Sequence, residues 1–186
     1  NDGSLTPEDR VALGTPYPDF TWGITNTFQI KDFDISFLIQ GVQGITVLNG
    51  DVYYNETKKW NKKYTKNRWV SAEHPGDGKT PYQNVKTGHD LMLTDYPLQN
   101  ASYACLRNFT VGYTLPATAA RKIKLSGVRF YVSGSNLLYI WGSGYKGINP
   151  ESRMTSGNYS SAMISGYQRG GFPLTSTISA GFDINF

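Results

Sequence analysis

Five stretches of this 186-residue chain alternate between apolar and polar side chains with a period of two. In the last of them, Ile178, Ala180, Phe182, Ile184 and Phe186 are apolar, and most of the residues between them are polar. Such alternation predicts strands with one apolar and one polar face. The predicted strands are residues 20–30, 33–40, 103–113, 128–138 and 174–186, each bound being approximate.

These strands are long for an ordinary soluble protein. Each has about 10 residues, the length that a tilted strand needs to cross a bilayer, whereas strands of soluble domains average about 5 or 6. Their connections alternate between short and long: Lys31-Asp32 predicts a hairpin turn, while segments 41–102 and 140–172 are long. Short periplasmic turns and long extracellular loops are typical of outer-membrane barrels. We therefore expect segments 1–19, 41–102 and 140–172 to be extracellular.

The composition agrees with an extended β protein. Only 17% of the residues are charged, and the chain holds 20 Gly, 13 Tyr, 9 Phe and 4 Trp. No apolar run approaches the roughly 20 residues of a membrane helix, which excludes helical spans but not membrane strands. Cys105 is the single cysteine, so an internal disulfide is excluded.

Five strands are too few to close a barrel, and an open sheet in lipid would leave two unpaired edges. The pattern therefore predicts the C-terminal five antiparallel strands of a larger transmembrane β-barrel. We expect the remaining strands and any plug domain to lie outside this chain.

Several sequence blocks resemble one family. "YACLRNFTVGYTLP" (103–116), "GVRFYVSGSNLLYIW" (127–141), "YKGINPE" (145–151), the ending at 170–186 and the start at 2–28 are similar, in the same order, to blocks of SusC/RagA-type TonB-dependent outer-membrane transporters. Asn149 stands where that family usually has Asp, and Ser176 lies near a frequent Arg. The long basic loop between the second and third predicted strands has no counterpart in these blocks.

The resemblance implies a nutrient importer in the outer membrane of a Gram-negative bacterium, built as a barrel of about 22 strands around a plug. It implies uptake of oligosaccharides or peptides, energised by the TonB system through an N-terminal part that is absent here. It also implies a SusD-like surface lipoprotein as a lid. Outer-membrane lipid and the barrel-assembly machinery are further expected partners, and nucleic acid is not one.

No catalytic constellation is present, so we expect no enzymatic activity. His74 and His89 lie 15 residues apart in the long loop without a partner for metal or acid–base chemistry. Aromatic residues in the loops and beyond the fourth strand are candidates for stacking on a glycan or peptide. Packing of these loops against the barrel or lid is the alternative for them. The substrate-contact candidates are Tyr53, Tyr54, Trp60, Tyr64, Trp141 and Tyr145.

The polar faces of two predicted strands are expected to line the lumen, either along a hydrated path or in hydrogen bonds to the plug. The lumen-lining candidates are Asp34, Ser36, Gln40, Thr175, Thr177, Ser179, Asp183 and Asn185. On the opposite face, a terminal aromatic after an alternating strand resembles the signal that the barrel-assembly machinery reads. Phe182, Ile184 and Phe186 are the candidates for that signal, with Phe186 in the periplasmic aromatic girdle.

"NDGSLTPED" resembles the end of a calcium loop, since Gly3 and Asp9 match its sixth and twelfth positions. Asp2 and Asp9 are thus candidate ligands in a partial calcium site, and a plain Asp-Gly turn is the alternative. We expect no other cofactor. For the chain as a whole, the alternative to an importer is a soluble β-sandwich that binds carbohydrate through exposed aromatic rings, which would need shorter strands.

Overall fold

The computed structural model describes residues 6, 8, 11–51, 67–80, 82, 94–152 and 166–186. The chain divides into two compact units. We call residues 18–44, 100–152 and 171–186 the strand unit. Residues 1–17, 45–99 and 153–170 form the loop unit.

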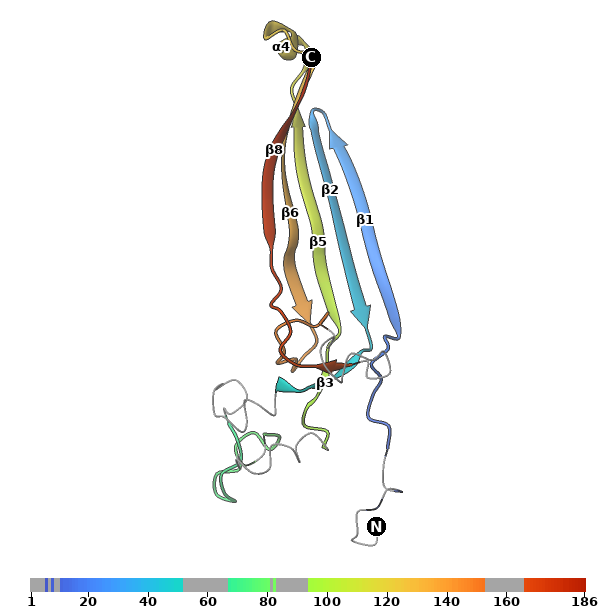
Figure 1. Ribbon diagram of the computed structural model, residues 1–186, viewed down its shortest axis with the longest axis vertical. Coiled ribbons are helices and arrows are strands. Elements are labelled where there is room, and N and C mark those ends of the chain that lie inside the picture. The colour runs from blue at the N-terminus through green and yellow to red at the C-terminus, as the bar shows by residue number, and fades with distance from the viewer. Residues whose placement is uncertain are drawn as a thin grey trace. The chain divides into compact units, whose positions relative to one another are not determined.

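The strand unit is built on one five-stranded antiparallel sheet, in the order β1-β2-β5-β6-β8 (Figure 1). Its strands are β1 (Phe20–Ile30), β2 (Phe33–Gln43), β5 (Tyr103–Thr114), β6 (Gly127–Trp141) and β8 (Thr177–Asn185). The predicted all-β chain with five long antiparallel strands is therefore confirmed.

Two strands run three residues further at their C-terminal ends than the alternation indicated, and β8 is shorter. β2 continues to Gln43 and β6 to Trp141, because Val42 pairs with Tyr103 and Tyr103 in turn pairs with Trp141. Trp141 thus lies in a strand rather than in the following loop. β8 begins at Thr177, so the candidate Thr175 precedes it.

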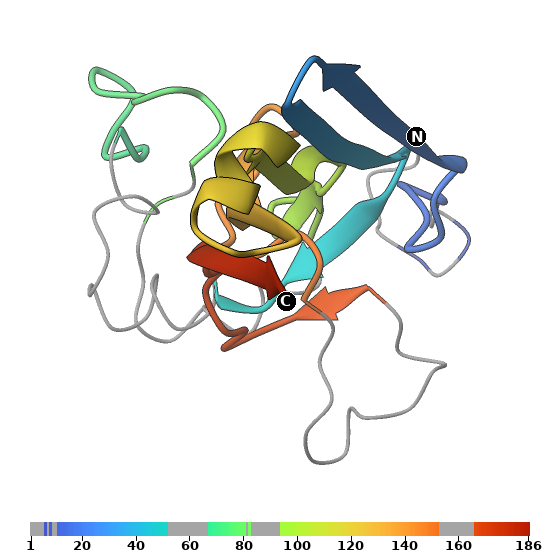
Figure 2. The ribbon, with the colours of Figure 1, turned by 90° about the horizontal axis from the view of Figure 1, so that it is seen from above.

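One end of the sheet gathers the short connections and the end of the chain. The Lys31-Asp32 turn lies there, and the Thr114 amide donates to the Asp32 carbonyl at 2.8 Å. The short helix α4 (Ala117–Lys122) follows Pro116, contacts β6, and lies at the end of the strands nearest the viewer in Figure 2. The Ser126 amide donates to the Asn185 carbonyl at 2.8 Å, which fixes the last strand beside this connection.

One face of the sheet is apolar across all five strands. Ile30, Phe33, Tyr113, Phe130 and Phe182 are successive Cα partners, so they form one continuous row. Four of the five are exposed by 48% or more of their surface in this chain. An apolar face of this extent requires a partner other than water.

The loop unit contains a small sheet in the order β4-β3-β7, formed by β3 (Thr46–Asn49), β4 (Leu98–Asn100) and β7 (Tyr167–Gln168). Ile45 and Val47 are each only 1% exposed. Buried Asn49 donates through Nδ2 to Oε1 of Gln99 at 3.0 Å, so its polar group is satisfied. Strands of two to four residues are too short to show a period, which is why the alternation did not predict them.

The described parts of the chain contain no helix long and apolar enough to cross a membrane. Asp2 and Asp9 lie outside the described residues, as do Tyr53, Tyr54, Trp60 and Tyr64.

Candidate functional site

The polar face of the five-stranded sheet carries hydroxyl groups in a row. Thr27, Ser36, Thr110, Ser133 and Ser179 are successive Cα partners across the five strands. Alternation within β2 and β8 places several of the lumen-lining candidates on this same face. They are Asp34, Ser36, Gln40, Thr177, Ser179, Asp183 and Asn185.

Arg129 organises the end of this face near the hairpin turn. Its Nε and Nη2 donate to the two carboxylate oxygens of Asp34 at 3.0 and 2.6 Å, in a bidentate pair. Nη1 lies 3.4 Å from Asp183, and the guanidinium carbon lies 5.2 Å from the centre of the Tyr131 ring. Three strands, β2, β6 and β8, are thereby linked across the polar face.

Two glycines make room for this arrangement. A Cβ at Gly112 would collide with the guanidinium of Arg129 and the carboxylate of Asp34, which meet over β5 at that position. A Cβ at Gly181 would collide with the Tyr131 hydroxyl. The glycines in β5 and β8 therefore serve the ion pair and the tyrosine, by letting side chains cross a strand.

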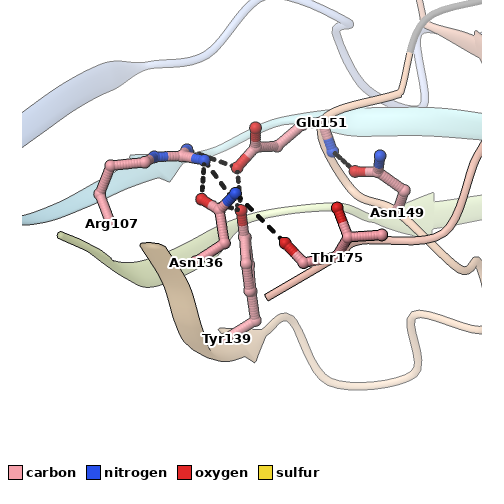
Figure 3. A network of polar contacts seen from close by, with 6 residues as sticks. All are labelled: Arg107, Asn136, Tyr139, Asn149, Glu151 and Thr175. Carbon is pink, nitrogen blue, oxygen red and sulfur yellow. Dashed lines mark hydrogen bonds and ion pairs between the residues drawn. The ribbon is translucent and has the colours of Figure 1, made fainter. Parts of the chain in front are cut away.

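A second polar network lies where β5 and β6 both lose register (Figure 3). Arg107 has no Cα partner in β2 or in β6, and Asn136 adopts a left-handed backbone with φ of 54°. A bulge re-aims a side chain, and here it turns Arg107 toward three acceptors. Arg107 donates to Asn136 Oδ1 at 2.8 Å, to the Tyr139 hydroxyl at 2.9 Å and to Glu151 at 2.6 Å.

This network also holds both limbs of the connection between β6 and β8. On the outgoing limb, the Asn149 side chain accepts from the Glu151 amide at 2.9 Å. The side-chain Nδ2 of Asn149 donates to the backbone carbonyl of Phe172, on the returning limb, at 3.1 Å. Ser176 donates to the Asn136 carbonyl at 2.6 Å. We call Arg107, Asn136, Tyr139, Asn149 and Glu151 the clasp.

Aromatic rings continue from the clasp along the end of the sheet. Tyr103 lies 6.1 Å from Tyr139, Tyr139 lies 6.5 Å from Trp141, and Trp141 lies 6.1 Å from Tyr145, measured between ring centres. The structure thus brings together the candidates Trp141 and Tyr145. Tyr145 is only 6% exposed and Trp141 is 43% exposed, so Trp141 is the ring of this pair that a ligand could contact.

Neither the alternation nor the family resemblance singled out Arg107, Asn136, Glu151 or Arg129. A signal was present for two of them, because Arg107-Asn108 and Ser135-Asn136 place two polar residues in succession within alternating strands. Such doublets indicate a bulge. Nothing in the local pattern identified Glu151 or Arg129 as partners.

The last candidates lie on the apolar face. Phe182 and Ile184 are 64% and 39% exposed, and Ile184 pairs with Val128. Phe186 follows β8 and is 94% exposed. All three side chains are therefore exposed.

In the described loops, His74 and Glu73 make hydrogen bonds to Ser71, within a single turn. The backbone amide of His74 donates to the Ser71 carbonyl in a tight turn, at 3.0 Å. The Ser71 hydroxyl donates to Glu73 at 2.7 Å, which lowers the pKa of that carboxyl below its usual range. Within the described residues, no three His, Cys, Asp or Glu side chains gather as metal ligands would.

No family model matches the chain. The chain is 30% identical over 192 residues to TonB-dependent receptor P3 of Formosa agariphila, with 100% of this chain and 18% of that protein covered. It is 26% identical over 151 residues to TonB-dependent receptor SusC of Bacteroides thetaiotaomicron, with 81% of this chain and 14% of that protein covered. The chain thus spans less than a fifth of the length of these relatives.

Among solved structures, the chain is similar to the RagAB peptide importer in its closed-closed state. The TM-score is 0.66 at 21% identity, covering 94% of this chain and 18% of that one. The open-open state gives a TM-score of 0.63 at 22% identity, covering 91% and 17%. These similarities identify the chain as a homologue, over its whole length, of the SusC-type TonB-dependent receptors, consistent with a C-terminal segment of such a receptor.

Proposed function

We propose that this chain forms the last five strands of the barrel of a SusC-type importer in the outer membrane, a barrel of about 22 strands. The observation that carries the proposal is the apolar face. Two of its rows, from Ile30 to Phe182 and from Phe28 to Ala180, are apolar across all of β1, β2, β5, β6 and β8, and their large side chains are mostly exposed. Strands of 9 to 15 residues suit a tilted passage through a bilayer.

The two outer strands support a larger barrel. Among the described residues, β1 pairs only with β2 and β8 pairs only with β6. Each leaves one row of backbone donors and acceptors open, which is prohibitive in lipid unless further strands close the sheet. The strands that precede this segment in the full-length protein would pair with both edges.

The polar face then lines the lumen. Its hydroxyl row and the Arg129 pairs with Asp34 and Asp183 offer hydrogen bonds to water or to a plug inside the barrel. Thr175, just before β8, and Asn185, at its end, extend this polar surface.

The full-length protein is proposed to import oligosaccharides or peptides with energy from the TonB system, and to have no enzymatic activity. A SusD-like surface lipoprotein is its proposed lid. The similarity to SusC and the RagAB fold support this assignment over a soluble β-sandwich. Among the described residues, Trp141 is proposed to contact the substrate, and Tyr145 packs against it. The other proposed contacts are in the long loop, at Tyr53, Tyr54, Trp60 and Tyr64.

Phe182, Ile184 and Phe186 are proposed to form the signal for the barrel-assembly machinery. Their exposure on the apolar face leaves them accessible before the barrel is embedded. A calcium site at Asp2 and Asp9 remains a separate proposal, tested by calcium titration of the full-length protein.

The experiment is fractionation of the full-length protein in its native host, followed by gel mobility with and without boiling. An importer of this type should require detergent for release from the outer membrane, and its unboiled band should migrate differently from its boiled band. It should also co-purify with a surface lipoprotein. Release without detergent, with a single band position, would overturn the proposal.

A further inference from the structure

A hollow of about 350 Å³ opens on the strand unit at the end of the sheet opposite the hairpin turn. Its floor belongs to the apolar face, where Trp22, Gly41, Ala104 and Ile140 are successive Cα partners. A Cβ at Gly41 would collide with the Trp22 indole, so this ring lies over Gly41. The absence of a side chain at Gly41 therefore lets an indole form part of the wall.

The rim of the hollow is polar, in contrast to the rest of the apolar face. Gln43, Asn100, Ser102 and Ser143 stand around it. The Asn100 carboxamide oxygen accepts from the Ser102 amide at 2.9 Å, and the Ser102 hydroxyl accepts from the Gly44 amide at 3.0 Å. Among the described residues, neither the Gln43 carboxamide nor the Trp22 Nε1–H has a hydrogen-bond partner. These two groups are free to bind a ligand.

The position of the hollow along the membrane normal follows from the strand geometry. Phe33, near the other end of the apolar face, is eight residues from Gly41 along β2. At about 3.3 Å per residue and a tilt of about 40°, the two rows are separated by about 20 Å along the membrane normal. The apolar band of a membrane barrel is about 25 Å tall. The hollow therefore lies at the edge of the band, at the level of the lipid headgroups on the side of the long loops.

The chemistry of the lining selects among headgroups. Among the residues that the structure describes, no Asp, Glu, Lys, Arg or His lines the hollow. A phosphate would find no opposite charge there, since anionic headgroups are held by ion pairs or charge-assisted hydrogen bonds. Indole rings beside amides and hydroxyls suit an uncharged, polyhydroxylated group, because the rings can contact its C–H faces while the amides bond its hydroxyls.

We propose that this hollow binds the uncharged sugar headgroup of a glycolipid in the outer leaflet, with the start of an acyl chain on Ala104 and Ile140. The inference rests on the proposed membrane embedding. It differs from substrate uptake, because Trp22, Ala104 and Ile140 of the lining share one row of the apolar face, whereas the importer's substrate would pass along the polar face. Tyr103 and Trp141, whose rings lie beside Tyr139, also border the hollow.

The test uses the full-length transporter in nanodiscs that contain equal amounts of a dioleoyl glucosyl glycerolipid and dioleoylphosphatidylcholine. Native mass spectrometry of the released protein reports which lipid is retained. The glucolipid should be retained by the unmodified protein. Trp22→Ala and Gln43→Ala should each reduce that retention about 5-fold, the size of one lost ring contact or hydrogen bond.

Matched controls lie in the same hairpin. Phe28→Ala removes another ring from the apolar face of β1, and Gln29→Ala removes another glutamine side chain, both away from the hollow. Both should retain the glucolipid as the unmodified protein does. Failure to enter nanodiscs would overturn the membrane assignment, whereas entry without glucolipid preference, or equal loss in controls and variants, would overturn this site alone.

Discussion

Arg107 and Glu151 form an ion pair of 2.6 Å although 44 residues separate them in the sequence. The pair joins a bulged strand to the segment that follows β6, and both side chains are mostly shielded, at 21% and 28% exposure. Because Arg107 also holds Asn136 and Tyr139, the pair is the centre of the clasp rather than an isolated surface contact.

Breaking the clasp should destabilise the folded barrel. Arg107→Met and Glu151→Gln are each expected to cost about 1–3 kcal/mol, because each leaves partly buried partners without their charged bond. The temperature at which the folded gel band of the full-length protein disappears measures this. Glu73→Gln, on an exposed turn, serves as the control and should leave that temperature unchanged. Since the two residues act together, the double variant should lose less than the sum of the single losses; full additivity would contradict the pairing.

The two hydrogen bonds of the Asn149 side chain can be tested separately. Asn149→Asp keeps the oxygen that accepts from the Glu151 amide but loses the donor that reaches the Phe172 carbonyl. Hydrogen exchange at the Glu151 amide should stay slow in Asn149→Asp and become fast in Asn149→Ala. Equal exchange in the two variants would show that the side-chain oxygen does not protect that amide.

The faces of β8 can be told apart by charge. Ile178 lies on the apolar face near mid-height of the sheet, in the row that includes Phe109, and its neighbour Thr177 lies on the polar face. Ile178→Arg should destabilise the barrel by about 2–4 kcal/mol, the cost of a cation near the membrane midplane. Thr177→Arg should cost much less. Unfolding titrations in lipid vesicles measure both, and a larger loss for Thr177→Arg would reverse the assignment of the faces.

Gly112 should not tolerate a side chain. Gly112→Ala places a methyl group where Arg129 and Asp34 meet, so the bidentate pair must open, at a cost of about 1–3 kcal/mol. Gly23→Ala is the matched control, because its Cβ would have only ordinary contacts, the nearest at 3.8 Å from the Ile39 carbonyl oxygen. The temperature at which the folded gel band of the full-length protein disappears should fall for Gly112→Ala only.

Phe186 should matter for assembly rather than for transport. Deleting it should lower the amount of folded protein in the outer membrane, while Phe186→Trp, which keeps an aromatic ring at the interface, should restore that amount. The protein that does assemble should take up substrate at the normal rate per molecule. Normal amounts of the deletion variant would leave Phe186 as a girdle residue only.

The sequence alone determined the number of long strands, the hairpin and the apolar or polar side of each strand, because side-chain direction in a strand is a local property with a period of two. It also carried the resemblance to the SusC/RagA family in ordered blocks. It did not show the short strands β3, β4 and β7, which are too brief for a period, or helix α4.

Only the tertiary structure decided which side chains meet. Arg129 reaches Asp34 across 95 residues of sequence and over a strand whose glycine leaves the path open. Arg107 reaches Glu151 because bulges in β5 and β6 turn it out of the alternation. The hollow beside Trp22 exists because four strands align Trp22, Gly41, Ala104 and Ile140 in one row. Polar doublets in the sequence mark where the bulges lie, but register is set by pairing between distant segments, and no local pattern shows which partners a bulged side chain reaches.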